Sequence, residues 1–386
     1  MSRSIAPERY ATRLERAQAV VAERQVGALL IGPGADLRWL IGYEAMPLER
    51  LTMLVLPATG RATLVVPRLE AAAARSASGV EHGVVDLASW EETDDPVDLV
   101  ARQDGLDAAA DGSAQVLVSD RLAAAFLLPI QTRLPAATFG LASAVLSDLR
   151  AVKDEEEIGL LRRAAQAADR TVAAICAARL VGRTEADVAR EVRERLVAEG
   201  HDEAAFWIVA SGPNSASPHH GAADRVISAG EPIVLDIGGR IEGYGSDITR
   251  TLWPTGGDEA RGPDVEYRTL FSTLERAQAA ASAAAVVGAS GEDVDTAARS
   301  IIAEAGFGDA FIHRTGHGIG LEGHEEPYLV GGNSEPLVAG NCFSTEPGIY
   351  LEGRYGARIE DIVVCRAEGP DILNGAPRSL AVVSGV

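Results

Sequence analysis

The stretch Ile233-Val-Leu-Asp-Ile-Gly238, together with Gly245-Ser-Asp-Ile-Thr-Arg-Thr-Leu252, decides the fold of this 386-residue chain. The first run is apolar up to a Gly-Gly turn signal and predicts a buried strand, and the second predicts its returning partner. If the chain reverses around Ile241-Glu242, Asp236 and Asp247 lie directly opposite each other, with Cβ atoms about 5 Å apart. Two buried carboxylates that close cannot both ionise cheaply unless a cation lies between them. From the hairpin alone, a pair of turn aspartates without a ligand is an equally good interpretation.

Three later segments add further candidate metal ligands. The glycine-rich run 313–325 contains three histidines, and two glutamates lie in strand-like apolar runs. The five candidate ligands are Asp236, Asp247, His317, Glu346 and Glu360. One histidine and four carboxylates make an oxygen-rich set that suits two divalent ions such as Mn²⁺ or Co²⁺. Two such ions about 3.5–4 Å apart can activate a water molecule and polarise a scissile carbonyl.

In order and spacing, these segments resemble the metallopeptidase family of the pita-bread fold, which includes prolidase, aminopeptidase P and methionine aminopeptidase. The run His313 to Glu325 is similar to the signature of the proline-peptidase branch and departs from it at Gly323, where the signature has a β-branched residue. The resemblance covers residues 150–370 well and the preceding residues more weakly.

The resemblance implies an α/β (α+β) protein with two domains. Residues 1–150 are expected to form an N-terminal creatinase-like α/β domain. Residues 151–386 are expected to form a catalytic pita-bread domain with a curved, mainly antiparallel sheet and flanking helices. The N-terminal domain argues against methionine aminopeptidase, which lacks one.

The resemblance also implies a role for each ligand. On the family pattern, Asp236 binds one metal ion, and His317 and Glu346 hold the other. Asp247 and Glu360 bridge the two ions. Glu346 also suits a proton-shuttle role, as general base for the water and then as acid for the leaving amine.

Four further residues are candidates for the substrate side of the site. His219 has the spacing of the family's substrate-facing histidine, and its neighbour His220 would point elsewhere in an extended segment. By resemblance, His313 and His324 line the substrate side, and His324 donates a hydrogen bond to the carbonyl oxygen as it becomes an oxyanion. Arg358 is expected to orient carboxylates or bind a substrate carboxylate, and an ion pair behind the metal ligands is a comparable alternative.

The resemblance and the ligand set together predict a dinuclear Xaa-Pro peptidase. The favoured activity is that of an Xaa-Pro dipeptidase (prolidase), acting on small peptides with proline at the second position. Aminopeptidase P activity on longer peptides is the alternative, and a metal-free pita-bread binding module is the rival from another class. The two ions are expected to be Mn²⁺, with Co²⁺ or Zn²⁺ as alternatives, and the expected assembly is a homodimer.

Composition narrows the function further. The net charge of −21 argues against nucleic acid or an anionic membrane as a partner, because phosphate binding needs a basic face. Lys153 is the only lysine, so Schiff-base chemistry has no other candidate. The three cysteines form no CxxC pair and are expected to be buried and reduced. The sequence shows no apolar run long enough to span a bilayer and no secretory signal after Met1, so we expect a cytoplasmic protein.

Local signals predict several other elements. Apolar residues at helical spacing predict an amphipathic helix over residues 7–26, and alternating runs predict a hairpin over residues 51–67. The acidic run from Asp154 predicts the start of a long helix that ends at Gly182, and Thr184 predicts the start of the next. A second pair of helices is predicted over residues 267–287 and 292–305.

Overall fold

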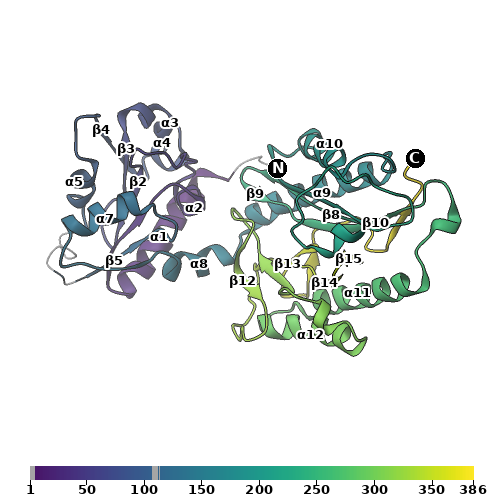
Figure 1. Cartoon of the computed structure of the whole chain (residues 1–386). Coiled ribbons are helices and arrows are strands. Elements are labelled where there is room, and N and C mark those ends of the chain that lie inside the picture. Colours follow the sequence, from purple (N-terminus) through teal and green to yellow (C-terminus); the bar gives the residue numbers. More distant parts are fainter. Residues whose placement is uncertain (1–4, 107–111, 113) are drawn as a thin grey trace. The chain divides into compact units, whose positions relative to one another are not determined.

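The computed structural model describes residues 5–106, 112 and 114–386 (Figure 1). The chain divides into two compact units, Met1–Arg150 and Ala151–Val386. Residues 1–4, where the segment searched for a secretory signal begins, lie outside the described residues. Among the described residues, no helix combines the length and the apolar character needed to span a membrane.

The first unit contains a six-stranded mixed sheet with the strand order β4-β3-β2-β1-β5-β6. β2 pairs antiparallel with β1 and β3, whereas the β1–β5, β5–β6 and β3–β4 pairs are parallel. The strands are β1 (Val26–Ile31), β2 (Met53–Pro57), β3 (Thr63–Pro67), β4 (Asp86–Trp90), β5 (Gln115–Val118) and β6 (Thr138–Leu141). The helical segments are α1 (Pro7–Glu23), α2 (Ala35–Ile41), η1 (Arg68–Glu70), α3 (Ala71–Arg75), α4 (Ser78–Glu81), α5 (Pro96–Ala101), α7 (Ala124–Arg133) and α8 (Ser143–Ala151).

Two elements predicted in this unit are present, but the first helix is shorter than expected: α1 ends at Glu23, and Val26 belongs to β1. α1 buries one face, formed by Tyr10, Leu14, Ala17 and Val21, as the helical spacing requires. The β2–β3 hairpin has the predicted antiparallel pairing, and its turn includes Gly60 with a φ of 97°. Glycine tolerates this left-handed conformation because it has no Cβ.

The second unit contains two five-stranded sheets and a two-stranded ribbon. The first sheet has the path β18-β10-β8-β7 with β9 paired to β8, and only its β10–β18 pair is parallel. Its strands are β7 (Glu203–Ser211), β8 (Ile233–Ile241), β9 (Tyr244–Gly245), β10 (Ile248–Pro254) and β18 (Ala381–Val383). The second sheet is antiparallel, with the order β12-β11-β13-β16-β17. The remaining strands are β11 (Gly316–Gly318), β12 (Glu325–Leu329), β13 (Cys342–Thr345), β16 (Asp361–Val364), β17 (Asp371–Ile372) and, in the ribbon, β14 (Gly348–Leu351) and β15 (Tyr355–Arg358).

Each of these two sheets has its own pair of long helices and its own apolar core. α9 (Glu155–Cys176) and α10 (Glu185–Ala198) share a core with β8 and β10. α11 (Val265–Ala284) and α12 (Gly291–Glu304) share a second core with β13 and β16. Three 3₁₀ turns complete the unit: η2 (Gly212–Ala216), η3 (Glu259–Arg261) and η4 (Gly308–Ala310). The mainly antiparallel architecture with flanking helices is therefore confirmed.

The predicted starts of α9 and α10 are confirmed, but the predicted end of α9 is wrong. α9 begins with a capping box between Asp154 and Glu157, and Thr184 caps α10. α9 ends at Cys176 instead of at Gly182. The N–H groups of residues 180–182 bond to the carbonyls of residues 385 and 227, so they cannot continue the helical ladder.

Candidate metal centre

The β8–β10 hairpin carries Asp236 and Asp247, but in a different register from the predicted one. The chain reverses through Glu242-Gly243, which both have positive φ (52° and 81°), as a two-residue primed turn requires. Asp236 therefore pairs with Thr249, and Asp247 lies two positions before Thr249. The prediction that the two aspartates are directly opposite was wrong, because the reversal is centred one residue later than Ile241-Glu242. Since the side-chain period of a strand is two, this register keeps both carboxylates on one face.

Glu346 and Glu360 face each other across a second hairpin. Glu346 lies between β13 and β14, and Glu360 lies between β15 and β16. The ladder of β13 and β16 ends at the pair Thr345–Asp361, and one further step along both strands reaches the two glutamates. An isolated bridge between Thr249 and Glu360 joins this hairpin to the first one. Ligands more than 100 positions apart thus come together through two paired hairpins.

His317, in β11, completes the cluster. Its Nε2 lies 3.2 Å from Glu346 Oε1 and 3.7 Å from Asp247 Oδ2. Its Nδ1 lies 3.1 Å from the Gly318 carbonyl, which assigns the hydrogen to Nδ1 and leaves Nε2 for the carboxylates. One ligand atom from each of Asp247, His317 and Glu360 lies within 4.8 Å of the others, and all three residues are buried.

The electrostatics of the cluster favour a bound cation. Burial, together with neighbouring carboxylates, raises the pKa of Asp247 and of Glu360 well above the usual value. Burial also raises the pKa of Asp236, although Arg358 opposes the shift. Burial alone would raise the pKa of Glu346 too, but the hydrogen bond and charge of His317 outweigh it and lower this pKa to about 2.

The same residues fit divalent ions by a second criterion. Asp236 Oδ1 is buried and has no hydrogen-bond partner among the residues that the structure describes. A buried acceptor without a donor is costly unless a water or an ion satisfies it. Four carboxylates and one imidazole Nε2 supply the hard and borderline ligands that Mn²⁺, Co²⁺ or Zn²⁺ accept.

Arg358 lies behind the cluster and is almost fully buried, with 2% exposure. It forms an ion pair with Asp236 Oδ2. Its Nε donates to Thr249 Oγ1 (2.9 Å), and Nη1 donates to the Tyr350 hydroxyl (2.8 Å). Because its donors are engaged in this way, the role of an ion-pair partner behind a metal ligand fits Arg358 better than that of a partner for a substrate carboxylate.

His313 and His324 lie next to the cluster in different environments. His313 Nε2 is 3.0 Å from the Tyr350 hydroxyl, and burial lowers the pKa of His313. The His324 ring centroid is 4.0 Å from that of His317. Burial, with help from the neighbouring charge of His317, lowers the pKa of His324 to about 4. At neutral pH both rings are therefore uncharged. The His313 N–H lies on Nδ1 and donates to the Arg314 carbonyl (2.8 Å), so its Nε2 accepts from Tyr350. His324 Nδ1 faces the Arg314 guanidinium (3.5 Å), which places the His324 N–H on Nε2.

Two residues in this network, Thr249 and Tyr350, were not predicted from the sequence. Thr249 bonds Glu360 Oε2 at 2.7 Å as well as Arg358, and Tyr350 connects Arg358 with His313. Their positions opposite and near the ligands depend on strand register. A prediction of these two residues would have required the correct strand register, which could not be derived from the sequence.

His219 and His220 have different surroundings. His220 Nε2 is 2.9 Å from Glu185 Oε2, and the Glu185 side chain is completely buried. Burial would raise the pKa of Glu185, but hydrogen bonds from Ser211, His220 and Asn214 outweigh it and lower this pKa. His219 is exposed, and its charge contributes to the lowered pKa of the two site histidines described above. His220 therefore has an anchoring contact, and His219 as the substrate-facing residue stays a prediction.

Fold and site together define a metallopeptidase preceded by a creatinase-like domain. Residues 159–367 match "Metallopeptidase family M24", and residues 13–152 match "Creatinase/Prolidase N-terminal domain". The chain belongs to the metallopeptidase family M24 and is a hydrolase. This confirms the resemblance to the pita-bread peptidases, whose members depend on divalent metal ions.

Relatives and solved structures cover almost the whole chain. It is 47% identical over 385 residues, 99% of each chain, to "Probable dipeptidase PepE" of Mycobacterium tuberculosis. It is 31% identical over 360 residues, 93% of this chain and 95% of the relative, to "Xaa-Pro dipeptidase" of Pyrococcus horikoshii. The crystal structure of dipeptidase PepE from Mycobacterium ulcerans matches with a TM-score of 0.91 at 46% identity, covering 98% of this chain and 99% of that one.

Proposed function

We propose that this protein is an Xaa-Pro dipeptidase that uses two divalent ions, with Mn²⁺ as the expected metal. The observation that carries the proposal is the convergence of four carboxylates and His317 at the junction of two hairpins. The dipeptidase names of two relatives support the substrate class. The alternative, aminopeptidase P, has the same chemistry and differs in the length of peptide accepted.

The proposed ligands divide between the two ions. Asp236 would hold one ion, while His317 and Glu346 would hold the other. Asp247 and Glu360 would bridge them. When bound, the ions supply Lewis-acid activation of a water molecule and of the scissile carbonyl.

The residues around the ligands would orient the substrate and move protons. Glu346, whose lowered pKa keeps it ionised, can accept a proton at a carboxylate oxygen and later return it to the proline nitrogen. His324 can donate its N–H to the carbonyl oxygen as negative charge develops there, and such a donor is most effective when it is fixed in advance. Arg358 holds Asp236 in place through their ion pair.

The length preference depends on what receives the C-terminal carboxylate of a dipeptide. That group lies one residue beyond the scissile bond, and an unpaired carboxylate in a partly buried site is costly. Because Arg358 is engaged with Asp236, Thr249 and Tyr350, His219 and His313 are the candidates that remain from the sequence prediction. Since the His313 N–H already donates to the Arg314 carbonyl, a hydrogen bond from His219 is the one that would favour dipeptides over longer chains.

Three matched substrates test this proposal: an Xaa-Pro dipeptide, its C-terminal amide and the Xaa-Pro-Xaa tripeptide. The free dipeptide should give the highest kcat/KM, and amidation should reduce it sharply. A better rate with the amide or the tripeptide would identify an aminopeptidase P instead. An Xaa-Ala dipeptide serves as control, and equal hydrolysis of this peptide would refute proline specificity.

We further propose that the protein acts as a homodimer in the cytoplasm, on small peptides. The support is the resemblance of the whole chain to the proline peptidases. Light scattering coupled to size exclusion tests the assembly, and a monomeric mass at micromolar concentration would contradict it.

A further inference from the structure

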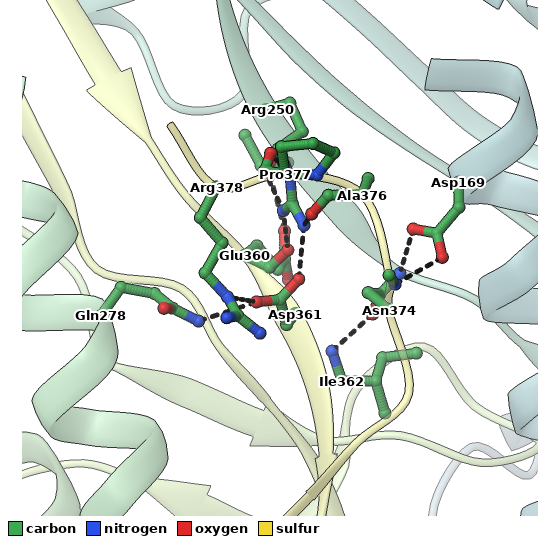
Figure 2. A network of polar contacts seen from close by, with 12 residues as sticks. Asp169, Arg250, Gln278, Glu360, Asp361, Ile362, Asn374, Ala376, Pro377 and Arg378 are labelled. Atoms are coloured by element: carbon green, nitrogen blue, oxygen red, sulfur yellow. Dashed lines mark hydrogen bonds and ion pairs between the residues drawn. The ribbon is translucent and has the colours of Figure 1, made fainter. Parts of the chain in front are cut away.

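Arg250 is a buried arginine that neither the resemblance nor the proposed mechanism uses. It follows Thr249 in β10 and is 2% exposed. Its guanidinium has five N–H donors, and each one has an acceptor (Figure 2). The acceptors are Asp361 Oδ1 (2.6 Å) and the backbone carbonyls of Thr249 (2.9 Å), Glu360 (2.7 Å), Ala376 (2.7 Å) and Pro377 (2.8 Å).

These bonds reach the proposed bridging ligand Glu360 from its backbone side. Glu360 lies between β15 and β16, so its carbonyl is not part of either strand ladder. The bond from Arg250 holds that carbonyl, while Thr249 bonds the backbone N–H (3.1 Å) and side-chain Oε2 (2.7 Å) of Glu360. The orientation of the Glu360 carboxylate is thereby fixed at three points.

Asp361, which follows Glu360, links Arg250 to two further side chains. Its carboxylate is completely buried and accepts from Arg250, from Arg378 Nε and from Gln278 Nε2 (3.0 Å). Two arginines around one carboxylate leave a local positive charge beside the acidic metal cluster.

Two acceptors of Arg250, the carbonyls of Ala376 and Pro377, belong to the C-terminal segment 374–378. This segment is also hydrogen-bonded to β16 and to α9. Asn374 Oδ1 accepts from the Ile362 N–H at 2.8 Å (Figure 2). The Gly375 N–H donates to Asp169 Oδ2 at 2.6 Å. Asp169 lies on α9. This segment therefore has fixed positions for the two carbonyls that Arg250 needs.

We propose that Arg250 is a positioning residue for the metal centre, and that segment 374–378 belongs to that centre although it contributes no ligand. The inference rests on the proposed function, since it assumes that Glu360 binds metal. Arg250 acts through Glu360 and Asp361 and touches neither substrate nor ion. A lysine at this position keeps the charge but has only three donors, so at least two of the five bonds are lost.

The test compares Mn²⁺ binding to metal-stripped wild type, Arg250→Lys and the control Arg13→Lys, by isothermal titration calorimetry. Arg13 is a buried arginine in the first unit, 4% exposed, that donates to the Trp39 carbonyl. Changing an outer partner of a metal ligand typically lowers metal affinity about 10–100-fold. We expect that loss for Arg250→Lys and none for Arg13→Lys, even if both variants unfold at a lower temperature in chelator.

Unchanged Mn²⁺ affinity in a folded Arg250→Lys protein would overturn the inference and leave Arg250 a purely structural residue. If that variant does not fold, Arg378→Gln takes its place, because Arg378 is partly exposed and supplies one bond to Asp361. It should bind Mn²⁺ several-fold more weakly than wild type, and unchanged affinity would again overturn the inference. Failure of the wild type to bind two ions would instead refute the proposed function.

Discussion

Asp247→Asn should stabilise the metal-stripped protein while it abolishes metal binding and turnover. The substitution keeps the side-chain volume and removes one negative charge from a buried group of carboxylates. Without a cation, the fold must either hold Asp247 charged near Glu360 or protonate it, and both options cost free energy. The raised pKa of Asp247, caused by burial and by neighbouring carboxylates, reflects that cost.

The expected gain in stability follows from the distance between the Asp247 and Glu360 carboxylates. Ligand atoms of Asp247 and Glu360 lie within 4.8 Å. At about that separation and an effective dielectric constant of about 20, two like charges repel by about 3–4 kcal/mol. Asp247 can avoid this repulsion by taking up a proton, which at pH 7 costs about 4 kcal/mol, the equivalent of about three pKa units. The destabilisation by the Asp247 charge therefore cannot exceed about that value. A gain of about 2–4 kcal/mol should raise the Tm of the metal-stripped protein by about 5–10 °C, given about 2–4 °C per kcal/mol for a unit of this size.

Differential scanning calorimetry in chelator and after Mn²⁺ addition measures this effect. The matched control is Asp236→Asn, which removes a charge that is already paired with Arg358. That control should lower the Tm in chelator, because it leaves a buried guanidinium without its partner. Only the wild type should gain Tm on addition of Mn²⁺. If stripped Asp247→Asn unfolds at or below the wild-type temperature, the carboxylates do not repel one another and the argument for a cation fails.

Further predictions concern the residues around the ligands. His324→Ala should lower kcat about 10²–10³-fold with little change in KM, and a change in KM alone would make it a binding residue. Glu185→Gln should lower stability by about 2 kcal/mol at neutral pH, since hydrogen bonds to a charged group are lost. Because the pKa of Glu185 is lowered, the wild-type advantage should be complete above about pH 4.3 and vanish as pH falls through the folded-state value; a pH-independent difference would contradict this. His219→Gln should reduce kcat/KM more than His220→Gln does, and the opposite ranking would give His220 the substrate contact.

Features that depend on short segments could be predicted from the sequence. The caps Asp154 and Thr184 fixed the starts of α9 and α10, because capping involves only the next three residues. The apolar run at β8 identified a buried strand because this signal also lies within a few consecutive residues. The grouping of the five ligands came from the resemblance to a known family, since no local rule joins residues more than 100 positions apart.

Features that depend on register or on distant backbone could not be predicted. A shift of one residue in the centre of the β8–β10 turn changes every cross-strand pair, and Glu242-Gly243 is not among the strongest turn sequences. α9 does not reach Gly182 because the N–H groups of residues 180–182 bond to carbonyls far along the chain. The role of Arg250 likewise depends on carbonyls of the C-terminal segment, which no pattern around residue 250 reveals.

The metal content of the active enzyme tests the central claim most directly. Protein stripped with a chelator should be inactive towards an Xaa-Pro dipeptide and should regain activity as Mn²⁺ is added, with two ions bound per chain by inductively coupled plasma mass spectrometry. Full activity in the stripped protein, with no metal detected, would contradict the account.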